Sequence, residues 1–327
     1  MSRLVTIIGG SGFVGRYIAR RMAKQGWRVR VAVRRPNEAA FVRPYGAVGQ
    51  VEPVLCNIRD DASVSSVIKG ADAVVNCVGI LAEKSRNTFD SVQSEGAARV
   101  ARLAAVEGVD HLVQISAIGA DTEAESDYAR TKGEGEAAVL EHFPSAVILR
   151  PSIIFGAEDQ FFNRFGGMAM FSPVVPLVGA ETRFQPVYVD DVAEAAVKGV
   201  LGEAAPGIYE LGGPETATFR GLMEKMLGMI HRKRVMIGLP FFAARIMAGG
   251  LDLLQFLSFG IFRNTMLTRD QVRNLAVDNV VAEDAKGFDD LGIKPVAMEA
   301  ILPDYLWRFR PSGQYDAIKQ SAGNLRT

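Results

Sequence analysis

The sequence of 327 residues has few of the residues that build disulfide frameworks or metal centres. Its only cysteines, Cys56 and Cys77, both lie in apolar, strand-like surroundings. This scarcity excludes a disulfide scaffold and favours buried free thiols in a reducing compartment. The three histidines, His111, His142 and His231, are far apart and lack the spacing of metal ligands, so we expect no metal site.

The chain also lacks a net charge, because 37 Lys and Arg residues balance 37 Asp and Glu residues. This balance argues against a nucleic-acid-binding protein. An apolar content of 48% is ordinary for a globular protein, and the length allows one large domain or two. The apolar run at the N-terminus is short and has no small-residue cleavage site, so it predicts a first strand rather than a signal peptide.

What the chain does have is a glycine-rich turn at its start. A short apolar strand leads into glycines spaced three apart, and a helical pattern follows at once. In such a unit Gly9 makes the tight turn, Gly12 lets phosphates approach and Gly15 lets the helix pack on the sheet. The alternative is a merely tight βα turn, but the flanking strand and helix favour a nucleotide site. The predicted pyrophosphate cradle consists of Gly9, Gly12, Phe13, Val14 and Gly15.

Strands that are apolar on both faces alternate with helical patterns through the first half of the chain. This pattern predicts an α/β fold with a Rossmann-like, doubly wound parallel sheet. Strands are expected at residues 5–9, 28–33, 51–56, 73–78, 111–116, 146–151 and 207–211, and helices at 13–25, 61–68, 90–107, 128–142 and 190–201. We expect a dinucleotide-binding domain at 1–155, a smaller, mixed and interleaved substrate or docking region at 156–312, and a polar tail at 313–327.

The end of the second strand indicates which dinucleotide is bound. In this fold an acidic residue there holds the ribose hydroxyls of NAD, whereas arginine accommodates the extra phosphate of NADP. Here Arg34 and Arg35 follow the strand and no carboxylate does, which favours NADP(H) over NAD(H). One of the two arginines could instead be a solvated loop charge, and Arg34 is the stronger candidate.

The ends of the third and fourth strands supply further candidates for cofactor binding. Asn57 and Ile58 follow the third strand, where a polar and an apolar side chain can flank an adenine ring. Cys77, Val78 and Gly79 end the fourth strand, where Gly79 allows the backbone to approach a ribose.

A tyrosine and a lysine form a candidate catalytic pair. Tyr128 and Lys132 lie at positions i and i+4 of a predicted helix and therefore share one of its faces. A nearby ammonium favours the phenolate, as a general acid for carbonyl reduction requires. Ser116, at the end of the preceding strand, can orient a substrate oxygen. Equally, the pair can serve only to bind the nicotinamide ribose, and both interpretations stay open.

Together these residues resemble the short-chain dehydrogenase/reductase superfamily in its extended or atypical branch. The resemblance covers about the first 230 residues and includes the glycines, the Tyr128/Lys132 pair and the segments 150–156 and 189–193. It implies that Tyr128 is the acid/base, that Lys132 holds the ribose and that Ser116 steadies the substrate. The single serine of segment 114–120 departs from the usual paired hydroxyls. Pro151 and Ile154 complete the predicted cofactor-binding set.

A narrower resemblance concerns segments 154–165, 267–272 and 290–293. They are similar to the NADPH-binding accessory subunits of respiratory complex I (NADH:ubiquinone oxidoreductase) and their α-proteobacterial relatives. This resemblance implies a structural or regulatory subunit that holds NADPH without turnover, partnered by complex I subunits. It also implies a cytoplasmic protein, peripheral on the cytoplasmic face of the inner membrane. A free-standing NADPH-dependent reductase, epimerase or dehydratase is the alternative.

The most apolar stretch, residues 241–262, is interrupted by Arg245, Asp252 and three glycines, which makes it a poor transmembrane span. A basic cluster at 231–234 precedes it, and basic residues beside an apolar helix favour an anionic membrane surface. An ordinary core helix is the alternative. Residues 307–310 form either a docking patch or a packed helix end.

Overall fold

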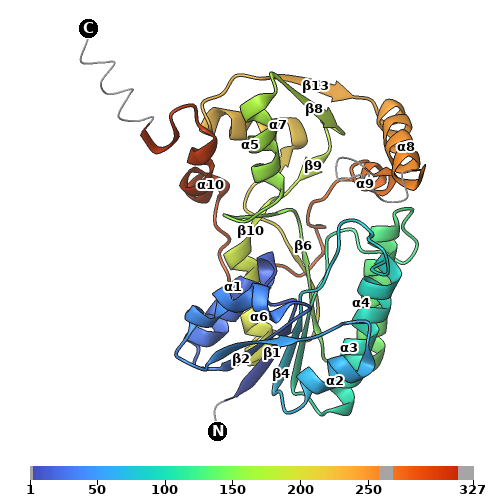
Figure 1. The fold of residues 1–327 in the computed structure, drawn as a ribbon, viewed down its shortest axis with the longest axis vertical. Helices are drawn as coiled ribbons and strands as arrows, with labels where there is room; N and C mark the ends of the chain where they lie inside the picture. Colours follow the sequence, from blue (N-terminus) through green and yellow to red (C-terminus); the bar gives the residue numbers. More distant parts are fainter. Residues whose placement is uncertain (1–2, 258–267, 316–327) are drawn as a thin grey trace. The chain divides into compact units, whose positions relative to one another are not determined.

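The structure, a computed structural model, describes residues 3–257 and 268–315 (Figure 1). The chain divides into two compact units made of interleaved segments. The first comprises Met1–Ser152, Val189–Gly212 and Val281–Pro295, and the second comprises Ile153–Tyr188, Gly213–Val280 and Val296–Thr327. This division differs from a single boundary after residue 155, because the chain returns to the first unit to complete its sheet and its helical layer.

The first unit is built on a seven-stranded sheet, in which every pairing is parallel and the order is β11-β6-β5-β4-β1-β2-β3. The order reverses direction at β1, as in a doubly wound fold, so the predicted Rossmann-like class is confirmed. The strands are β1 (Leu4–Ile8), β2 (Arg28–Val33), β3 (Val51–Leu55), β4 (Ala73–Asn76), β5 (His111–Ile115), β6 (Val147–Pro151) and β11 (Gly207–Leu211).

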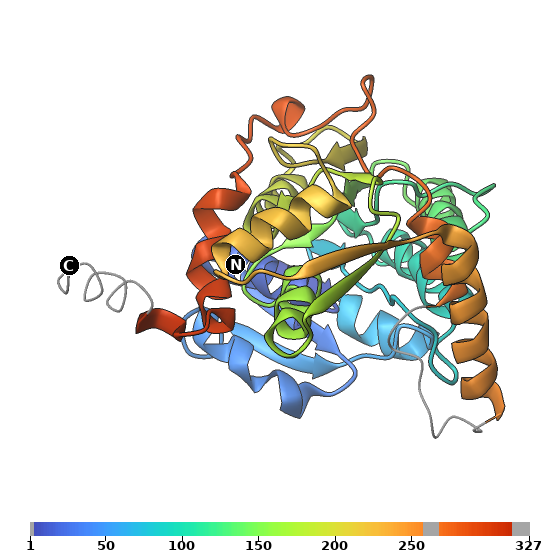
Figure 2. The same cartoon turned by 90° about the horizontal axis from the view of Figure 1, so that it is seen from above.

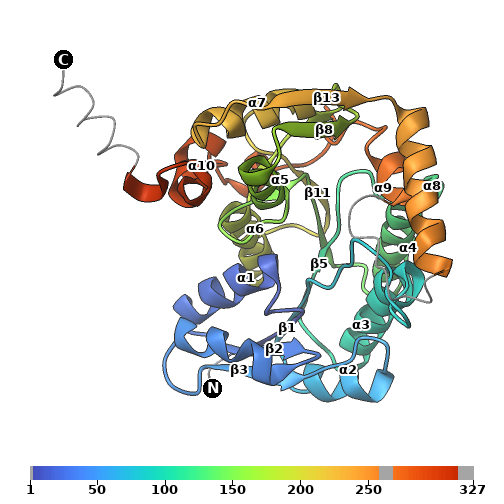
Figure 3. The same cartoon turned by 45° about the horizontal axis from the view of Figure 1, so that its top comes forward.

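Helices cover both faces of this sheet (Figure 3). Helices α1 (Phe13–Lys24) and α6 (Val189–Leu201) pack together on one face, and α2 (Asp61–Ile68), α3 (Glu95–Val106) and α4 (Asp127–His142) cover the other. Val5, Ile7 and Val75 in the central strands are fully buried, as the continuous apolar runs of a parallel sheet require. The short segment η1 (Pro36–Tyr45) joins β2 to β3.

The expected elements end within a few residues of the observed ones, with one difference of kind. The helix predicted at 90–107 opens with a π-helical turn, η2 (Asp90–Ser94), before α3 begins at Glu95. Such turns insert one extra residue into a helix, a change that hydrophobic periodicity over a window does not register. The turn carries Gln93, which is buried.

The second unit contains three two-stranded sheets and five α-helices among its described residues. Its core is aromatic, with Phe161 packed against Phe162, Phe165 and Phe219. The strands are β7 (Ile154–Phe155), β8 (Val174–Val178), β9 (Arg183–Phe184), β10 (Val187–Tyr188), β12 (Ala217–Thr218) and β13 (Val235–Leu239). The helices are α5 (Phe161–Phe171), α7 (Phe219–Met229), α8 (Phe241–Leu257), α9 (Arg269–Asn274) and α10 (Met298–Leu306). The short turns η4 (Trp307–Phe309) and η5 (Gly313–Tyr315) also belong to this unit, whereas η3 (Asp289–Leu291) belongs to the first.

Within the described ranges, no helix is both long and apolar enough to cross a bilayer. The apolar stretch 241–262 begins with α8, and its residues 258–262 lie outside the described residues, as do 316–327 of the predicted polar tail. Residues 307–310 form the end of the α10 region, where Arg232 and Arg310 donate to the backbone carbonyls of Phe309 and Met229. This segment is therefore packed on its own unit.

Candidate dinucleotide site

The glycine-rich turn has the geometry that a bound pyrophosphate needs. Gly9 takes a left-handed conformation (φ +80°) and its amide donates to the Ala32 carbonyl at 2.8 Å, which fixes the turn beside β2. Gly12 is the N-cap of α1 and has no side chain to cover the free amides of the first turn. These amides and the helix dipole favour an anion at this position.

Gly12 and Gly15 differ in what a side chain would meet. A Cβ on Gly12 would contact only the Gly9 carbonyl oxygen, at 3.1 Å. A Cβ on Gly15 would lie 2.6 Å from that oxygen and 2.7 Å from the Gly10 Cα atom, which no backbone tolerates. Gly15 is therefore required for the packing of α1, whereas Gly12 keeps the cradle open.

A cavity of about 280 Å³ adjoins the turn within the first unit. It brings together three parts of the sequence that were predicted separately, namely the turn, the end of β4 and the Ser116/Tyr128/Lys132 group. Its lining includes the predicted residues Gly12, Phe13, Val14, Gly15, Cys77, Gly79, Ser116, Tyr128 and Lys132. Ile80, Leu81 and Ile115 also line it and were not predicted, because they are indistinguishable in sequence from ordinary apolar residues.

Lys132 is the buried cation of this cavity. Its side chain lies in α4 with 6% of the residue exposed, and Nζ donates to the Ile115 carbonyl oxygen at 3.2 Å. Burial lowers the pKa of Lys132 to about 8, against the opposing influences of Glu136 and Cys77. The site thus retains a protonated lysine at neutral pH. In the described part of the chain its ammonium group donates to one acceptor, the Ile115 carbonyl oxygen, which leaves two N–H donors for a ligand.

Tyr128 and Ser116 lie at the same cavity. Tyr128, one turn before Lys132 in α4, packs edge-on against the Phe89 ring with 6.0 Å between ring centroids. Ser116 directly follows β5 and is 5% exposed, and its Oγ atom has no hydrogen-bond partner in the described part of the chain. A buried hydroxyl without a partner costs free energy unless a ligand or a water completes it.

Gln93 is a polar group of this region that the sequence did not reveal. Its Nε2 donates to Thr131 Oγ1 at 3.1 Å, whereas Oε1 is buried and lacks a partner among the described residues. A Cβ placed on Gly79 would lie 3.4 Å from Lys132 Nζ and 3.6 Å from Gln93 Oε1. Because Gly79 has no side chain, the Lys132 ammonium group and the Gln93 Oε1 atom both lie close to its backbone.

The two arginines after β2 differ in their partners. Arg35 pairs with Glu38 at 3.1 Å on an exposed surface. Arg34 is exposed and makes no ion pair or hydrogen bond within residues 3–257 and 268–315. The guanidinium of Arg34 is therefore the one left available to a phosphate.

The remaining predicted residues are placed around these groups. Asn57 follows β3, and its Oδ1 accepts a hydrogen bond from the Arg59 amide. Ile58 is buried against Gly96 in the core rather than facing the cavity. Val78 packs against Gly9 at the end of β4. Pro151 is buried at the end of β6, and Ile154 belongs to β7 of the second unit.

The two thiols have different surroundings. Cys56 is buried, as expected, but Cys77 is only half-buried because it lines the cavity. Burial raises the pKa of Cys56 to about 11 and that of Cys77 to about 12, which favours the thiol over the thiolate in both. No group of three or more His, Cys, Asp or Glu residues in the described ranges is arranged to hold a metal ion.

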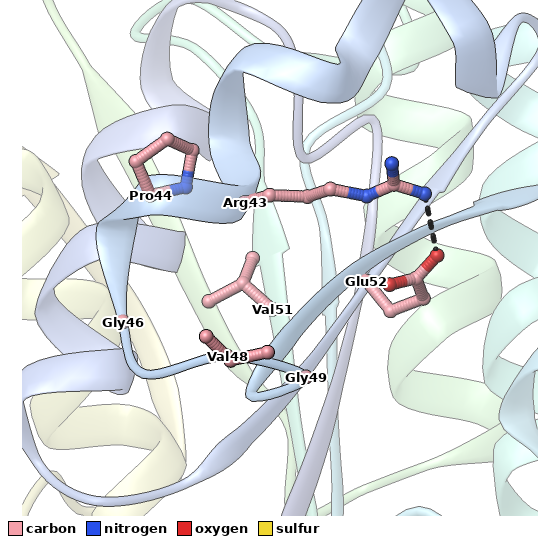
Figure 4. Close-up of a pocket in the computed structure, with 7 residues that line it drawn as sticks. All are labelled: Arg43, Pro44, Gly46, Val48, Gly49, Val51 and Glu52. Atoms are coloured by element: carbon pink, nitrogen blue, oxygen red, sulfur yellow. Dashed lines mark hydrogen bonds and ion pairs between the residues drawn. The ribbon is translucent and has the colours of Figure 1, made fainter.

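A second hollow, of about 290 Å³, lies between η1 and the start of β3 (Figure 4). Its walls are small and apolar residues such as Pro44 and Val51, and Arg43 pairs across it with Glu52 at 2.9 Å. None of the predicted site residues lines it. It therefore has no part in the candidate site.

The sheet order and the glycine cradle define a Rossmann-type dinucleotide-binding protein. This chain belongs to the NAD dependent epimerase/dehydratase family, whose model matches residues 5–212.

Three known proteins show how far the similarity extends. The mitochondrial NADH dehydrogenase [ubiquinone] 1 alpha subcomplex subunit 9 of Arabidopsis thaliana is 32% identical over 316 residues, covering 95% of this chain and 79% of that protein. The ceramide reductase of Caulobacter vibrioides is 32% identical over 194 residues, 59% of this chain and 60% of that protein. The crystal structure of gox2253 has the same fold, with a TM-score of 0.70 and 21% identity over 96% of this chain and 99% of that one.

Proposed function

We propose that this protein is an NADP(H)-binding accessory subunit of the respiratory NADH:ubiquinone oxidoreductase, complex I. The observation that carries the proposal is the extent of the similarity. The family model ends at residue 212, whereas the similarity to the NADH dehydrogenase subunit of Arabidopsis thaliana spans 95% of the chain. The ceramide reductase of Caulobacter vibrioides matches 59% of it. A similarity that includes the second unit favours the accessory-subunit role.

Three features of the first unit support NADP(H) as the resident nucleotide. The glycine turn offers free amides to a pyrophosphate, Lys132 offers donors to a ribose, and Arg34 is available to a 2′-phosphate. The nearest carboxylate after β2, Glu38, is paired with Arg35. The acidic ribose-binding group of an NAD site is therefore missing from this position.

In this role the dinucleotide stabilises the subunit and is not consumed. A ligand that binds only the folded state stabilises it by mass action, and the unpartnered Ser116 and Gln93 atoms gain hydrogen-bond partners when it is bound. We place the subunit peripherally, at the cytoplasmic face of the inner membrane, as a structural or regulatory component.

The test is purification of complex I from the source organism in mild detergent. We expect the chain to co-migrate with the complex and to carry NADP(H) in about equimolar amount, measured by mass spectrometry of the denatured sample. Complex I that is fully assembled without the chain would refute the proposal. A chain in the complex that carries NAD(H) would refute only the cofactor preference.

A free-standing NADPH-dependent reductase is the second candidate. The Tyr128/Lys132 pair and Ser116 at one cavity favour it, as does the similarity to a ceramide reductase. Here Tyr128 is the proton donor to the substrate oxygen. The discriminating assay is NADPH oxidation with ketone substrates, comparing the parent protein with Tyr128→Phe. Turnover that falls at least about a hundredfold in the variant would support the enzyme, and absence of turnover in both supports the subunit.

A further inference from the structure

In residues 242–248 of helix α8, the small side chains face inward and large ones face outward, although Phe241 at the start of the helix packs inward. The small residues Ala244 and Ala248 are fully buried, packed in a cluster with Val178 of β8 and Val272 of α9. The large residues Phe242 and Ile246 are 69% and 73% exposed. A helix on a water-soluble protein normally buries its large apolar side chains and exposes its polar ones.

Close packing on the inner side of α8 keeps it in this orientation. A Cβ on Gly249 would lie 2.5 Å from the Arg269 guanidinium, so the helix approaches α9 more closely than larger residues would allow. Turning Phe242 or Ile246 inward would require room that Ala244, Ala248 and Gly249 do not leave. The outward position of the large residues is thus fixed by packing.

The strand before α8 continues the exposed apolar surface. Among the residues that the structure describes, β13 pairs with β8 alone, and it leads into α8 (Figure 2). Val235 and Ile237 of β13 are 63% and 46% exposed. We name the set Val235, Ile237, Phe242, Ile246 and Met247 the α8 face.

Cations predominate in the sequence around the α8 face, and the first acidic residue of α8 is Asp252. Residues 231–250 contain Arg232, Lys233, Arg234 and Arg245 and no acidic residue, although the whole chain is neutral. These four cations make no ion pair within the described residues. Arg232 and Arg234 donate to the backbone carbonyls of Phe309 and Ala169, so their charges are not neutralised. Arg245 lies one turn from Phe242 in α8, on the exposed side.

We infer that the α8 face is the surface by which this protein binds an anionic lipid bilayer. Exposed large apolar side chains with uncompensated cations beside them match both layers of such a membrane, because the apolar groups enter the acyl boundary and the cations meet the headgroups. An uncharged apolar partner would match only the apolar side chains, and an acidic surface without apolar groups would match only the cations. This inference names the surface by which the proposed peripheral subunit contacts the membrane. It rests on the proposed function only for the identity of that membrane.

The first experiment measures flotation of the full chain with vesicles of phosphatidylcholine, with and without phosphatidylglycerol. We expect binding only to the anionic vesicles. Phe242→Ser with Ile246→Ser should weaken binding at least about tenfold, and Arg245→Glu should weaken it at least about fivefold. Val48→Ser and Lys24→Glu, exposed residues of the same kinds in the first unit, are matched controls and should leave binding unchanged.

The inference is overturned if the parent protein does not bind anionic vesicles, or if the α8 variants bind as the controls do. A thermal unfolding midpoint within a few degrees of the parent's reports that each variant is folded. A second measurement, incorporation of the same variants into detergent-solubilised complex I, separates this inference from the proposed function. If the α8 variants bind vesicles as the parent does but are no longer incorporated into complex I, the α8 face is a protein-docking surface. That result would overturn the lipid assignment. Vesicle binding by a chain that complex I lacks would refute the subunit role and leave the lipid assignment intact.

Discussion

The ammonium group of Lys132 donates a hydrogen bond to the Ile115 carbonyl oxygen, at 3.2 Å, in a position where the residue is 6% exposed. The pKa of Lys132 is about 8 because of this burial, below the ordinary value of 10.5. By linkage this difference corresponds to roughly 3 kcal/mol of lost folding stability at neutral pH. The protein thus retains a costly cation at the cavity, which is typical of a functional group.

The first prediction concerns the pH dependence of this cost. Below pH 8 the folded and unfolded states both carry the Lys132 proton and the whole cost is present. Between pH 8 and 10.5 the unfolded state binds more protons, so the Lys132 contribution to stability rises with pH. Lys132→Met should therefore be more stable than the parent by about 1–2 kcal/mol at pH 7, after loss of the Ile115 hydrogen bond, and this advantage should disappear at pH 10.

Urea unfolding at the two pH values measures this difference. Lys69→Met is the matched control, because Lys69 is exposed and its replacement removes no buried charge. A Lys132→Met variant that is less stable than the parent at both pH values would contradict the burial argument. The variant should also bind NADPH more weakly.

The second prediction separates two glycines of the cradle. Gly12→Ala should change the free energy of unfolding by less than about 1 kcal/mol and weaken NADPH binding at least about tenfold, because the methyl group occupies the approach of the phosphates. Gly15→Ala should lower stability by about 2–4 kcal/mol, because its Cβ meets backbone at 2.6 and 2.7 Å. Thermal unfolding and calorimetric titration measure the two effects, and equal effects of both substitutions on stability would contradict the assignment.

The third prediction concerns the choice of dinucleotide. Arg34→Ala should weaken NADPH binding about tenfold to a hundredfold, the value of one charge-assisted hydrogen bond to phosphate. Binding of NADH should change less than about threefold, since NADH lacks that phosphate. Arg35→Ala is the control, and we expect a smaller effect because Arg35 already pairs with Glu38. Equal losses for both nucleotides in Arg34→Ala would show that Arg34 does not bind the 2′-phosphate.

The fourth prediction uses the unpartnered hydroxyl of Ser116. In the nucleotide-free protein, Ser116→Ala should leave stability unchanged or raise it by about 1 kcal/mol, because it removes a buried group that has no partner. If a ligand completes this hydroxyl, the variant should gain less thermal stability from NADPH than the parent does. A variant destabilised without nucleotide would indicate that Ser116 is already satisfied in the free protein.

Much of the fold was predictable because its signals are local. The strand at 28–33 and the helix at 61–68 have the observed bounds, and the glycines at 9, 12 and 15 lie at the turn that their spacing predicts. Tyr128, Lys132 and Ser116 were predicted as one group from their positions after β5, and the structure places them at one cavity. Their roles, and the preference for NADP(H), stay predictions.

Other features depend on contacts between distant residues. Gln93 has no distinguishing neighbours in the sequence. Its amide is oriented by the hydrogen bond to Thr131, which places its oxygen beside Gly79. Ile58, whose place beside adenine stays a prediction, is buried because α3 packs over it at Gly96. The sequence favoured Arg34 over Arg35 only by its position at the strand end, and the ion pair of Arg35 with Glu38 supports the same order.

The sequence by itself determined the order of strands and helices, the cradle and the family to which the chain belongs, because turn chemistry and apolar periodicity act over a few residues. The tertiary structure decided which of the candidate side chains share a cavity. It also decided that α8 buries its alanines and exposes Phe242 and Ile246, since an apolar stretch in sequence does not say which of its sides will be covered. That choice depends on the shape of the surface formed by β8 and α9, on which Ala244 and Ala248 pack closely.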